Sequence, residues 1–171
     1  RVCDPGLPVV RLSVAEAFER LAGLDLAATL GPDGTPDREA LAAQVGRAGL
    51  RVAGDDTWSD LFSRVLVARV EPGLGDGQLV ALDRYPSCEA ALARRCPDDP
   101  RFAERFELYA CGVELANGFG ELTDPAEQRR RFEAEMDEKA RVYGERYPLD
   151  EDFLAALAQM PPASGIALGF D

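Results

Sequence analysis

Apolar residues in several parts of the chain recur with the three- and four-residue spacing of helices that bury one face. Residues 57–72 are an example, and their large apolar side chains fall on one side of a helix: Trp58, Leu61, Phe62, Val65 and Leu66. Ser13 followed three residues later by Glu16 is typical of a capped helix start. We predict helices over five ranges: 13–24, 37–50, 57–72, 123–148 and 150–162.

Other segments have the character of strands. Residues 78–86 are short and apolar and end at a proline. Each glycine within residues 101–122 would cost a helix about 1 kcal/mol relative to alanine. We therefore predict two strands in this range, joined by a turn at Cys111-Gly112. Residues 164–171 are predicted as a final buried strand.

The order of these elements predicts an α+β fold in which an antiparallel sheet is flanked by helices. The 171 residues are enough for one domain with a sizeable core. Residues 31–76 are predicted to form a helical, insertion-like segment, and residues 78–171 hold the strands. Between those strands, residues 87–100 are predicted as a short helix followed by a polar loop.

The charge of the chain narrows the class of partner. With 31 acidic and 19 basic residues the net charge is −12, which disfavours DNA and RNA duplexes and leaves a cationic substrate, a metal ion or a basic protein. No apolar run is long enough to cross a bilayer, and no signal peptide is visible. We therefore expect a cytoplasmic protein without DNA or membrane partners, whose four cysteines stay reduced.

The sequence contains no histidine, and this limits its chemistry. The chain cannot form Ser-His-Asp or Cys-His triads, histidine-ligated metal sites or imidazole acid–base pairs. Catalysis would have to depend on carboxylates, arginines, backbone dipoles and a bound metal ion.

Three glutamates, Glu107, Glu114 and Glu121, lie seven residues apart. If the predicted two-residue turn forms, Tyr109 faces Glu114 and Glu107 faces Ala116, so that the first two glutamates share one face of the hairpin. Two carboxylates on a buried face repel each other unless a cation lies between them, and Mg²⁺ carrying nucleotide phosphates is the usual occupant. The residues alone leave a second interpretation open, in which both side chains are exposed to water.

Two longer motifs carry a resemblance to a known family. RFELYACGVELANGFGELTDPAEQRRRF at 105–132, together with SGIALGFD at 164–171, resembles the C-terminal part of class II lysyl-tRNA synthetase catalytic domains. Both motifs are more closely similar to the truncated paralogues of these enzymes, the elongation factor P–(R)-β-lysine ligases, as is LSVAEAFERLAGLD at 12–25. Four residues follow the paralogues rather than the true synthetases: Leu115, Ala116, Thr123 and Ala167.

The resemblance implies part of the catalytic domain of a class II synthetase-like ligase. The implied reaction uses ATP and Mg²⁺ to activate lysine or (R)-β-lysine as an aminoacyl-adenylate, and then transfers the acyl group to a lysine of elongation factor P. The parent protein would be a homodimer. Two alternatives stay open: a fragment of a genuine lysyl-tRNA synthetase, and a synthetase-like domain that has lost catalysis and serves as a binding module.

The resemblance also implies roles for individual residues. Glu107 and Glu114 match the carboxylates that hold Mg²⁺ and ATP, and Leu115 and Gly169 match ATP-contacting positions. The substrate-binding positions of the family are matched by four residues: Asn117, Phe119, Glu121 and Ala167.

Several departures from the family pattern affect these expectations. The first and second family motifs, which supply a dimer interface and an ATP-binding arginine, are not found in the sequence, and no arginine follows Asp171. A histidine common in the paralogues is replaced by Gly120. We therefore expect residues 1–171 to be the C-terminal portion of one catalytic domain, inactive alone.

The implied roles require a break in strand geometry. Strict alternation places Glu114 and Glu121 on opposite faces, since seven is an odd number, whereas the resemblance requires one to face ATP and the other the substrate ammonium in the same pocket. A β-bulge would bring them together, and glycine tolerates a bulge well. We predict the bulge at Asn117-Gly118, with Gly120 as the alternative.

Overall fold

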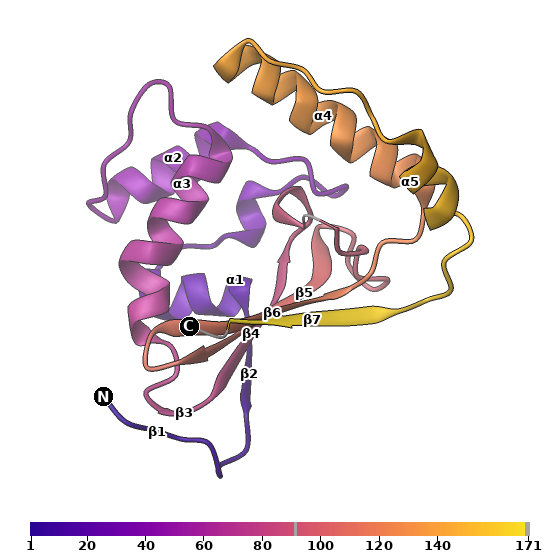
Figure 1. Ribbon diagram of the computed structural model, residues 1–171. Helices are drawn as coiled ribbons and strands as arrows, with labels where there is room; N and C mark the ends of the chain where they lie inside the picture. The colour runs from indigo at the N-terminus through magenta and orange to yellow at the C-terminus, as the bar shows by residue number, and fades with distance from the viewer. Residues whose placement is uncertain (91, 170–171) are drawn as a thin grey trace.

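The computed structural model describes residues 1–90 and 92–169 (Figure 1). Five strands in this part of the chain form one sheet in the order β2-β4-β5-β6-β7. Their bounds are Val10–Ser13, Val80–Pro86, Phe102–Ala110, Val113–Gly120 and Ser164–Leu168. The α+β class is confirmed, but the sheet is mixed rather than wholly antiparallel, because β2 lies parallel to β4. A short parallel ladder also pairs β1 (Cys3–Asp4) with β3 (Gly77–Gln78).

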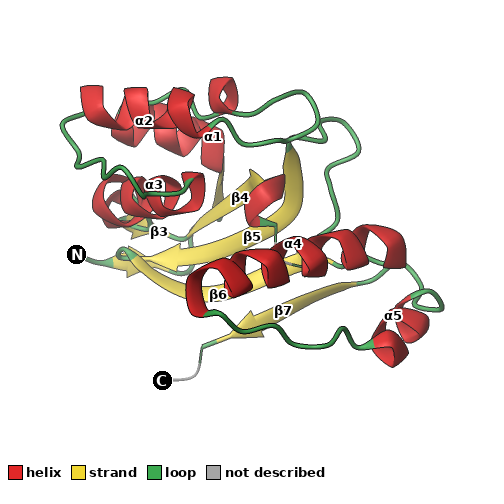
Figure 2. Cartoon of the chain, turned by 90° about the horizontal axis from the view of Figure 1, so that it is seen from above, coloured by secondary structure: helices red, strands yellow, loops and turns green. Residues whose placement is uncertain are grey.

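The helices begin where the sequence predicts, and several end earlier. Their bounds are Val14–Ala17 (α1), Arg38–Arg47 (α2), Trp58–Val65 (α3), Pro125–Tyr143 (α4) and Glu151–Leu157 (α5). α1 and α3 each continue into a π-helical turn, over Phe18–Ala22 and Leu66–Val70. Ser13 and Glu16 form the predicted capping box. In Figure 1 the labelled helices all lie above the strands, and Figure 2 shows α4 crossing in front of β6 and β7. We call this side of the sheet the helix-side face.

Segment 87–100 contradicts the prediction of a short helix. A 3₁₀ turn over Ser87–Glu89 is the one helical stretch among its described residues. Beyond it the chain runs along the ends of β5 and β6, where the Arg94 N–H donates to Gly120 O and the Glu104 N–H donates to Arg94 O, both at 2.8 Å. These strand ends would otherwise leave backbone groups unpaired, so an extended conformation is favoured over a helix.

β7 is a strand, as predicted, but it is not buried. Its Ile166 and Leu168 side chains have exposed fractions of 62% and 69%. The strand lies at the edge of the sheet, where β6 is its neighbour. Its other edge therefore faces solvent. The last two residues of the predicted strand, 170 and 171, lie outside the described residues.

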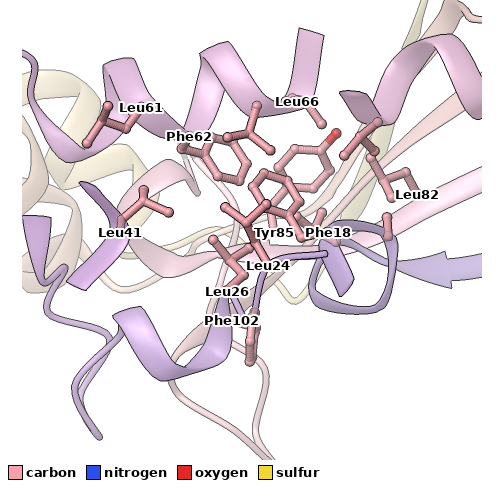
Figure 3. Packing of buried hydrophobic residues seen from close by; sticks show 14 of the residues in the cluster. Phe18, Leu24, Leu26, Leu41, Leu61, Phe62, Leu66, Leu82, Tyr85 and Phe102 are labelled. Atoms are coloured by element: carbon pink, nitrogen blue, oxygen red, sulfur yellow. The ribbon is translucent and has the colours of Figure 1, made fainter. Parts of the chain in front are cut away.

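The hydrophobic core lies between helices α1 and α3 and the part of the sheet formed by β2 and β4, which we call the β4 end. Phe62 stacks on Phe18 and on Trp58, with ring centroids 5.1 Å and 5.3 Å apart, and meets the Tyr85 ring edge-on at 6.5 Å. Figure 3 shows Phe18, Phe62 and Tyr85 packed together, with leucines around them. The core therefore covers the helix-side face next to β4.

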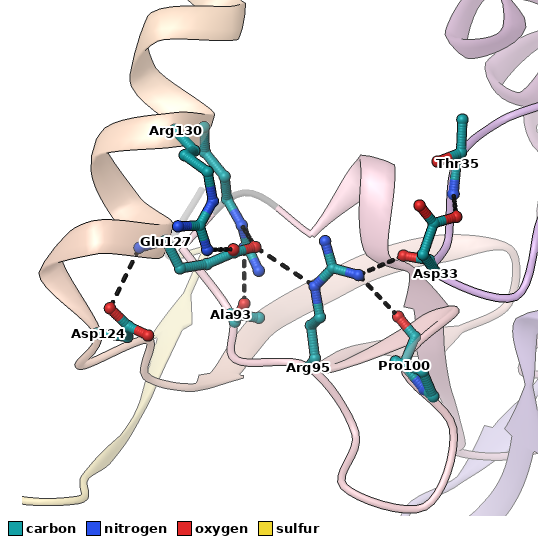
Figure 4. A network of polar contacts seen from close by, with 9 residues as sticks. Asp33, Thr35, Ala93, Arg95, Pro100, Asp124, Glu127 and Arg130 are labelled. Carbon is teal, nitrogen blue, oxygen red and sulfur yellow. Dashed lines mark hydrogen bonds and ion pairs between the residues drawn. The ribbon is translucent and has the colours of Figure 1, made fainter.

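Polar contacts, rather than apolar packing, hold α4 in place. Glu127 in its first turn accepts hydrogen bonds from Arg95 Nε at 3.3 Å and Arg131 Nε at 3.2 Å, and from Arg130. Figure 4 shows Arg95 reaching on from Glu127 to the backbone oxygen of Asp33. One carboxylate thus ties the start of α4 to two distant loops.

None of the helices in the described residues has the length and hydrophobicity needed to cross a membrane. α4 is the longest of them, and most of its residues are charged or polar. The four cysteines, all within the described residues, are free thiols.

Candidate active site

The hairpin formed by β5 and β6 is the centre of the candidate site. Its two-residue turn forms at Cys111-Gly112 as predicted, with positive φ angles of 54° and 80°. Next to the turn Tyr109 pairs with Glu114, which also matches the prediction. The turn therefore fixes the register at this end of the hairpin.

The predicted β-bulge exists, but it lies at Leu115 rather than at Asn117-Gly118 or Gly120. The register between β5 and β6 shifts at this residue, which has no partner on β5. β6 pairs with β7 only as far as Ala116. The bulge thus lies directly before the first residue of β6 that takes part in the regular β6–β7 pairing.

The bulge changes which side chains share a face. Beyond it Glu107 lies opposite Asn117, not opposite Ala116 as predicted, and Ala116 points to the other side of the sheet. Glu114 and Asn117, three positions apart, now lie on the same face as Glu107. The break in strand alternation that was predicted between Glu114 and Glu121 is thus present, but at a different residue.

The two glycines predicted to permit the bulge serve close packing instead. A Cβ at Gly118 would lie 2.4 Å from Phe106 Cε1, and a Cβ at Gly120 would lie 2.3 Å from Glu104 Oε2. Side chains of β5 thus lie across β6 on the face opposite to Glu107, where any larger residue would collide with them.

Glu107 is buried among hydrogen-bond donors, with an exposed fraction of 4%. Its Oε2 accepts from the hydroxyls of Tyr85 at 2.5 Å and Tyr109 at 2.7 Å, and its Oε1 accepts from Arg105 Nη2 at 2.6 Å. Burial, and then the carboxylate of Glu107, raise the pKa of both tyrosines. Both hydroxyls therefore remain donors at neutral pH, and the carboxylate is held in one orientation.

Glu114 is the open member of the acidic pair. It is exposed and lies diagonally from Glu107 on the same face. Partial desolvation raises the pKa of Glu114, and the negative charges of Glu107 and Glu71 raise it further, against an opposing effect of Arg105. A cation between the two carboxylates would relieve this repulsion.

Mg²⁺ fits this pair as part of a nucleotide complex. In the described part of the chain, no three Asp, Glu or Cys side chains are grouped so as to hold a metal ion by themselves. Mg²⁺ usually takes one or two protein carboxylates and fills its other positions with phosphate oxygens and water. Glu114 is open, and Glu107 keeps about one of its roughly four lone-pair positions free, so the donor set suits that mode of binding.

Three predicted substrate residues, two on β6 and one directly after it, form a row beside β7. Asn117 lies opposite Ala167, and Phe119 lies opposite Gly165. Glu121 reaches toward the same strand, because a Cβ at Gly165 would lie 2.8 Å from Glu121 Oε1. An amide, an aromatic ring and a carboxylate therefore follow one another along the helix-side face.

Asn117 carries an acceptor that the protein does not use. Its Oδ1 atom is buried and has no hydrogen-bond partner among the described residues, which is uncommon for a buried polar atom. Ala167, opposite it, is exposed. The surface beside Asn117 is thus open on the β7 side, and a ligand N–H group would supply the missing donor.

The two remaining ATP-binding predictions meet at the bulge. The Gly169 N–H donates to Leu115 O at 2.9 Å, and a Cβ at Gly169 would lie 3.7 Å from the same oxygen. The residue that follows β7 is thereby held beside Glu114. All the predicted site residues lie along β5, β6 and β7, from buried Glu107 to exposed Gly169.

Sequence reasoning gave no role to three residues of this site, namely Arg105, Tyr109 and Tyr85, although it placed Tyr109 opposite Glu114. Arg105 and Tyr109 flank Glu107 at two-residue spacing on one strand, and this alternation was the signal that could have identified them. Tyr85 comes from β4, and no local pattern connects it with Glu107.

A cavity of about 540 Å³ lies on the opposite face of the sheet. Its lining includes Ala81, Asp83, Glu104 and Phe106. Phe119 and Arg105 also line it, whereas none of the three glutamates does.

Comparison with known proteins places the chain in a family. Residues 7–171 match the class II tRNA synthetases for D, K and N. The chain therefore belongs to the class II tRNA synthetase family.

Curated relatives of the chain include ligases of two kinds. The chain is 39% identical over 166 residues to a lysine–tRNA ligase of Dehalococcoides mccartyi, covering 96% of this chain and 32% of the relative. It is 51% identical over 112 residues to an elongation factor P–(R)-β-lysine ligase of Haemophilus influenzae, covering 65% and 33%. A ligase of the same name from Klebsiella pneumoniae is 39% identical over 165 residues, covering 96% and 49%. The chain thus spans between a third and a half of the length of these relatives.

Proposed function

We propose that the whole protein is an ATP-dependent ligase that activates lysine or (R)-β-lysine as an aminoacyl-adenylate and transfers it to a lysine of elongation factor P. The observation that carries this proposal is the bulge at Leu115, which turns Glu114 and Glu121 to one face. A single strand can then present one carboxylate to Mg²⁺·ATP and another to the ammonium of the amino acid.

On the nucleotide side, Glu107 and Glu114 would hold Mg²⁺, which neutralises phosphate charge and orients the leaving group when bound. Tyr85, Tyr109 and Arg105 keep the Glu107 carboxylate in place. The backbone of Leu115 and Gly169, joined by a hydrogen bond, would form the surface on which the nucleotide lies.

On the substrate side, Glu121 would accept a charge-assisted hydrogen bond from the side-chain ammonium. Asn117 Oδ1 would accept from another N–H group of the amino acid, and Phe119 would cover its aliphatic carbons. Ala167 lies across the strand pair from Asn117. Its methyl group narrows the pocket wall and would affect which lysine isomer fits.

Elongation factor P is the favoured acceptor because Leu115, Ala116, Thr123 and Ala167 follow the pattern of the β-lysine ligases. A lysyl-tRNA synthetase is the second candidate, supported by the 39% identity to a lysine–tRNA ligase over nearly the whole chain. A non-catalytic binding module is the third. A homodimeric parent is part of the first two proposals.

ATP–pyrophosphate exchange by the whole protein, with lysine and with (R)-β-lysine, tests the proposal. Glu114→Gln should abolish exchange by weakening Mg²⁺·ATP binding. Glu121→Gln should raise KM for the amino acid about 10- to 100-fold, since a charge-assisted hydrogen bond contributes about 1.5–3 kcal/mol, and should leave KM for ATP unchanged.

Glu133→Gln, an exposed position on α4, is the matched control and should behave as wild type. A normal amino-acid KM in Glu121→Gln, or normal exchange in Glu114→Gln at saturating Mg²⁺, would contradict the assigned roles. Absence of exchange in the wild-type protein would favour the binding module. Radiolabelled amino acid offered to both acceptors then distinguishes elongation factor P from tRNA.

A further inference from the structure

Arg105 connects the proposed metal-binding pair with the substrate row. Its Nη2 donates to Glu107 Oε1 at 2.6 Å, and its Nη1 donates to Glu89 O at 2.7 Å. The guanidinium carbon lies 4.4 Å from the centroid of the Tyr85 ring and 6.0 Å from that of the Phe119 ring. The guanidinium is thus held by contacts with β4, β5, β6 and the 3₁₀ turn at Ser87–Glu89.

Arg105 keeps its hydrogen bond to Glu107 while another of its donors stays unpaired. The Nε atom is buried and has no hydrogen-bond partner among the described residues, although buried N–H groups are rarely left unpaired. A guanidinium that served packing alone could turn more of its donors toward acceptors. This one leaves a donor unused while Nη2 stays on the Glu107 carboxylate.

The contact between Arg105 and Glu107 is also shielded from water. Their side chains are 19% and 5% exposed. Arg94 and Glu104 form a pair of similar length, 2.7 Å, near the same strand, but they are 41% and 32% exposed and Glu104 lies on the opposite face. Breaking a buried pair leaves the remaining charge uncompensated, whereas an exposed pair contributes little. The second pair is therefore a matched control for the first.

We propose that Arg105 is a positioning residue, which fixes the Glu107 carboxylate so that its free lone pair points to the Mg²⁺·ATP position beside Glu114. This inference rests on the proposed function. Lysine cannot replace Arg105, because an ammonium group cannot lie flat on the Tyr85 ring and donate in two fixed directions at once.

Calorimetric titration of the whole protein with Mg²⁺·ATP, and separately with lysine, tests the inference. Arg105→Lys should weaken Mg²⁺·ATP binding at least tenfold and leave lysine binding within twofold of wild type. Arg94→Lys should leave both unchanged. In pyrophosphate exchange the half-saturating Mg²⁺ concentration should rise by the same factor in Arg105→Lys, with KM for the amino acid unaltered.

Tyr109→Phe provides a second variant, because it removes one donor to Glu107 without removing a charge. It should weaken Mg²⁺·ATP binding about three- to tenfold. Thermal unfolding shows whether Arg105→Lys folds. If this variant does not fold, the Mg²⁺·ATP affinity of Tyr109→Phe decides whether the inference holds. Wild-type affinity for Mg²⁺·ATP in the deciding variant overturns the inference, as does a wild-type protein that does not bind Mg²⁺·ATP. A wild-type protein that binds Mg²⁺·ATP but shows no exchange refutes the proposed function, while the calorimetry still tests Arg105.

Discussion

The two ends of the sheet are stabilised by different kinds of contact. At the β4 end, α1 and α3 bury stacked aromatic rings, and Phe18, Trp58 and Phe62 are at most 4% exposed. At the β7 end, the buried residue of α4 is Gln128, and the helix is held mainly by ion pairs of its charged residues. We infer that the β4 end supplies most of the folding free energy.

This difference shows where the candidate site obtains its rigidity. The site lies on β5 and β6, between the two ends. Glu107 is held by Tyr85, which belongs to the aromatic core, so the nucleotide side is anchored. Ala167 lies on an edge strand with exposed neighbours, so the substrate side can adjust to its ligand.

The largest expected effect comes from Phe62→Ala in the aromatic core. Removing a buried phenylalanine typically costs about 3–5 kcal/mol, and we expect that loss in denaturant-induced unfolding. Phe132→Ala is the counterpart on α4, where the partly buried ring packs against Phe153 with the ring centroids 6.0 Å apart. It should cost clearly less than Phe62→Ala, because the Phe132 ring is only partly buried. Equal losses for the two variants would contradict the comparison.

A smaller effect is expected from Gly118→Ala on β6, between the two ends. The new methyl group would lie 2.4 Å from the Phe106 ring, and overpacking of this kind typically costs about 1–3 kcal/mol. Gly46→Ala in α2 has open space around the new methyl group and should instead stabilise the protein by about 0.5–1 kcal/mol. Thermal unfolding of both variants measures the opposite signs.

A pH-dependent effect is expected at Asp56, next to α3. Arg64 donates to both of its carboxylate oxygens, at 2.6 Å and 2.8 Å, and these bonds, then the Ala53 N–H, hold the pKa of Asp56 well below its usual range. A lowered folded-state pKa gives stability that is present above the unfolded pKa of about 3.9 and is lost as the pH falls toward the folded value. Asp56→Asn should therefore be less stable than wild type at pH 7, with a difference that shrinks below about pH 4. A difference independent of pH would contradict this assignment.

The smallest effect is expected from Arg129→Ala at the β7 end. Its partner is Glu151 of α5, and the two side chains are 40% and 65% exposed. Exposed pairs contribute between about 0.2 and 1 kcal/mol, and the difference should disappear in 1 M salt, where screening extends to about 3 Å. A loss above 2 kcal/mol in unfolding experiments would show that ion pairs stabilise α4 far more than the comparison states.

Local signals in the sequence predicted the parts of the fold that depend on neighbouring residues. Ser13 with Glu16 marked a helix start, and Cys111-Gly112 marked the hairpin turn. The strand at Val10–Ser13 was missed because its partner begins 70 residues later, at Val80. Segment 87–100 was misassigned for a similar reason, since its backbone partners lie on β5 and β6.

The candidate site was predictable as a set of residues but not as a geometry. The motif resemblance singled out residues from Glu107 to Gly169, and the hairpin register gave the Tyr109–Glu114 pair. The position of the bulge is set by the register between β5 and β6, which no short pattern in the sequence records. Leucine also has no conformational preference that would mark Leu115 as the irregular residue.

The bulge at Leu115 also constrains how this gene can change. A deletion of one codon between Glu114 and Asn117 would turn Asn117, Phe119 and Glu121 to the other face of the sheet. An insertion of two codons would keep these three side chains on the same face but would shift each of them by two positions relative to β7. Substitutions can accumulate along this stretch while its length stays fixed, so an alignment of active relatives should contain no gap between Glu114 and Glu121.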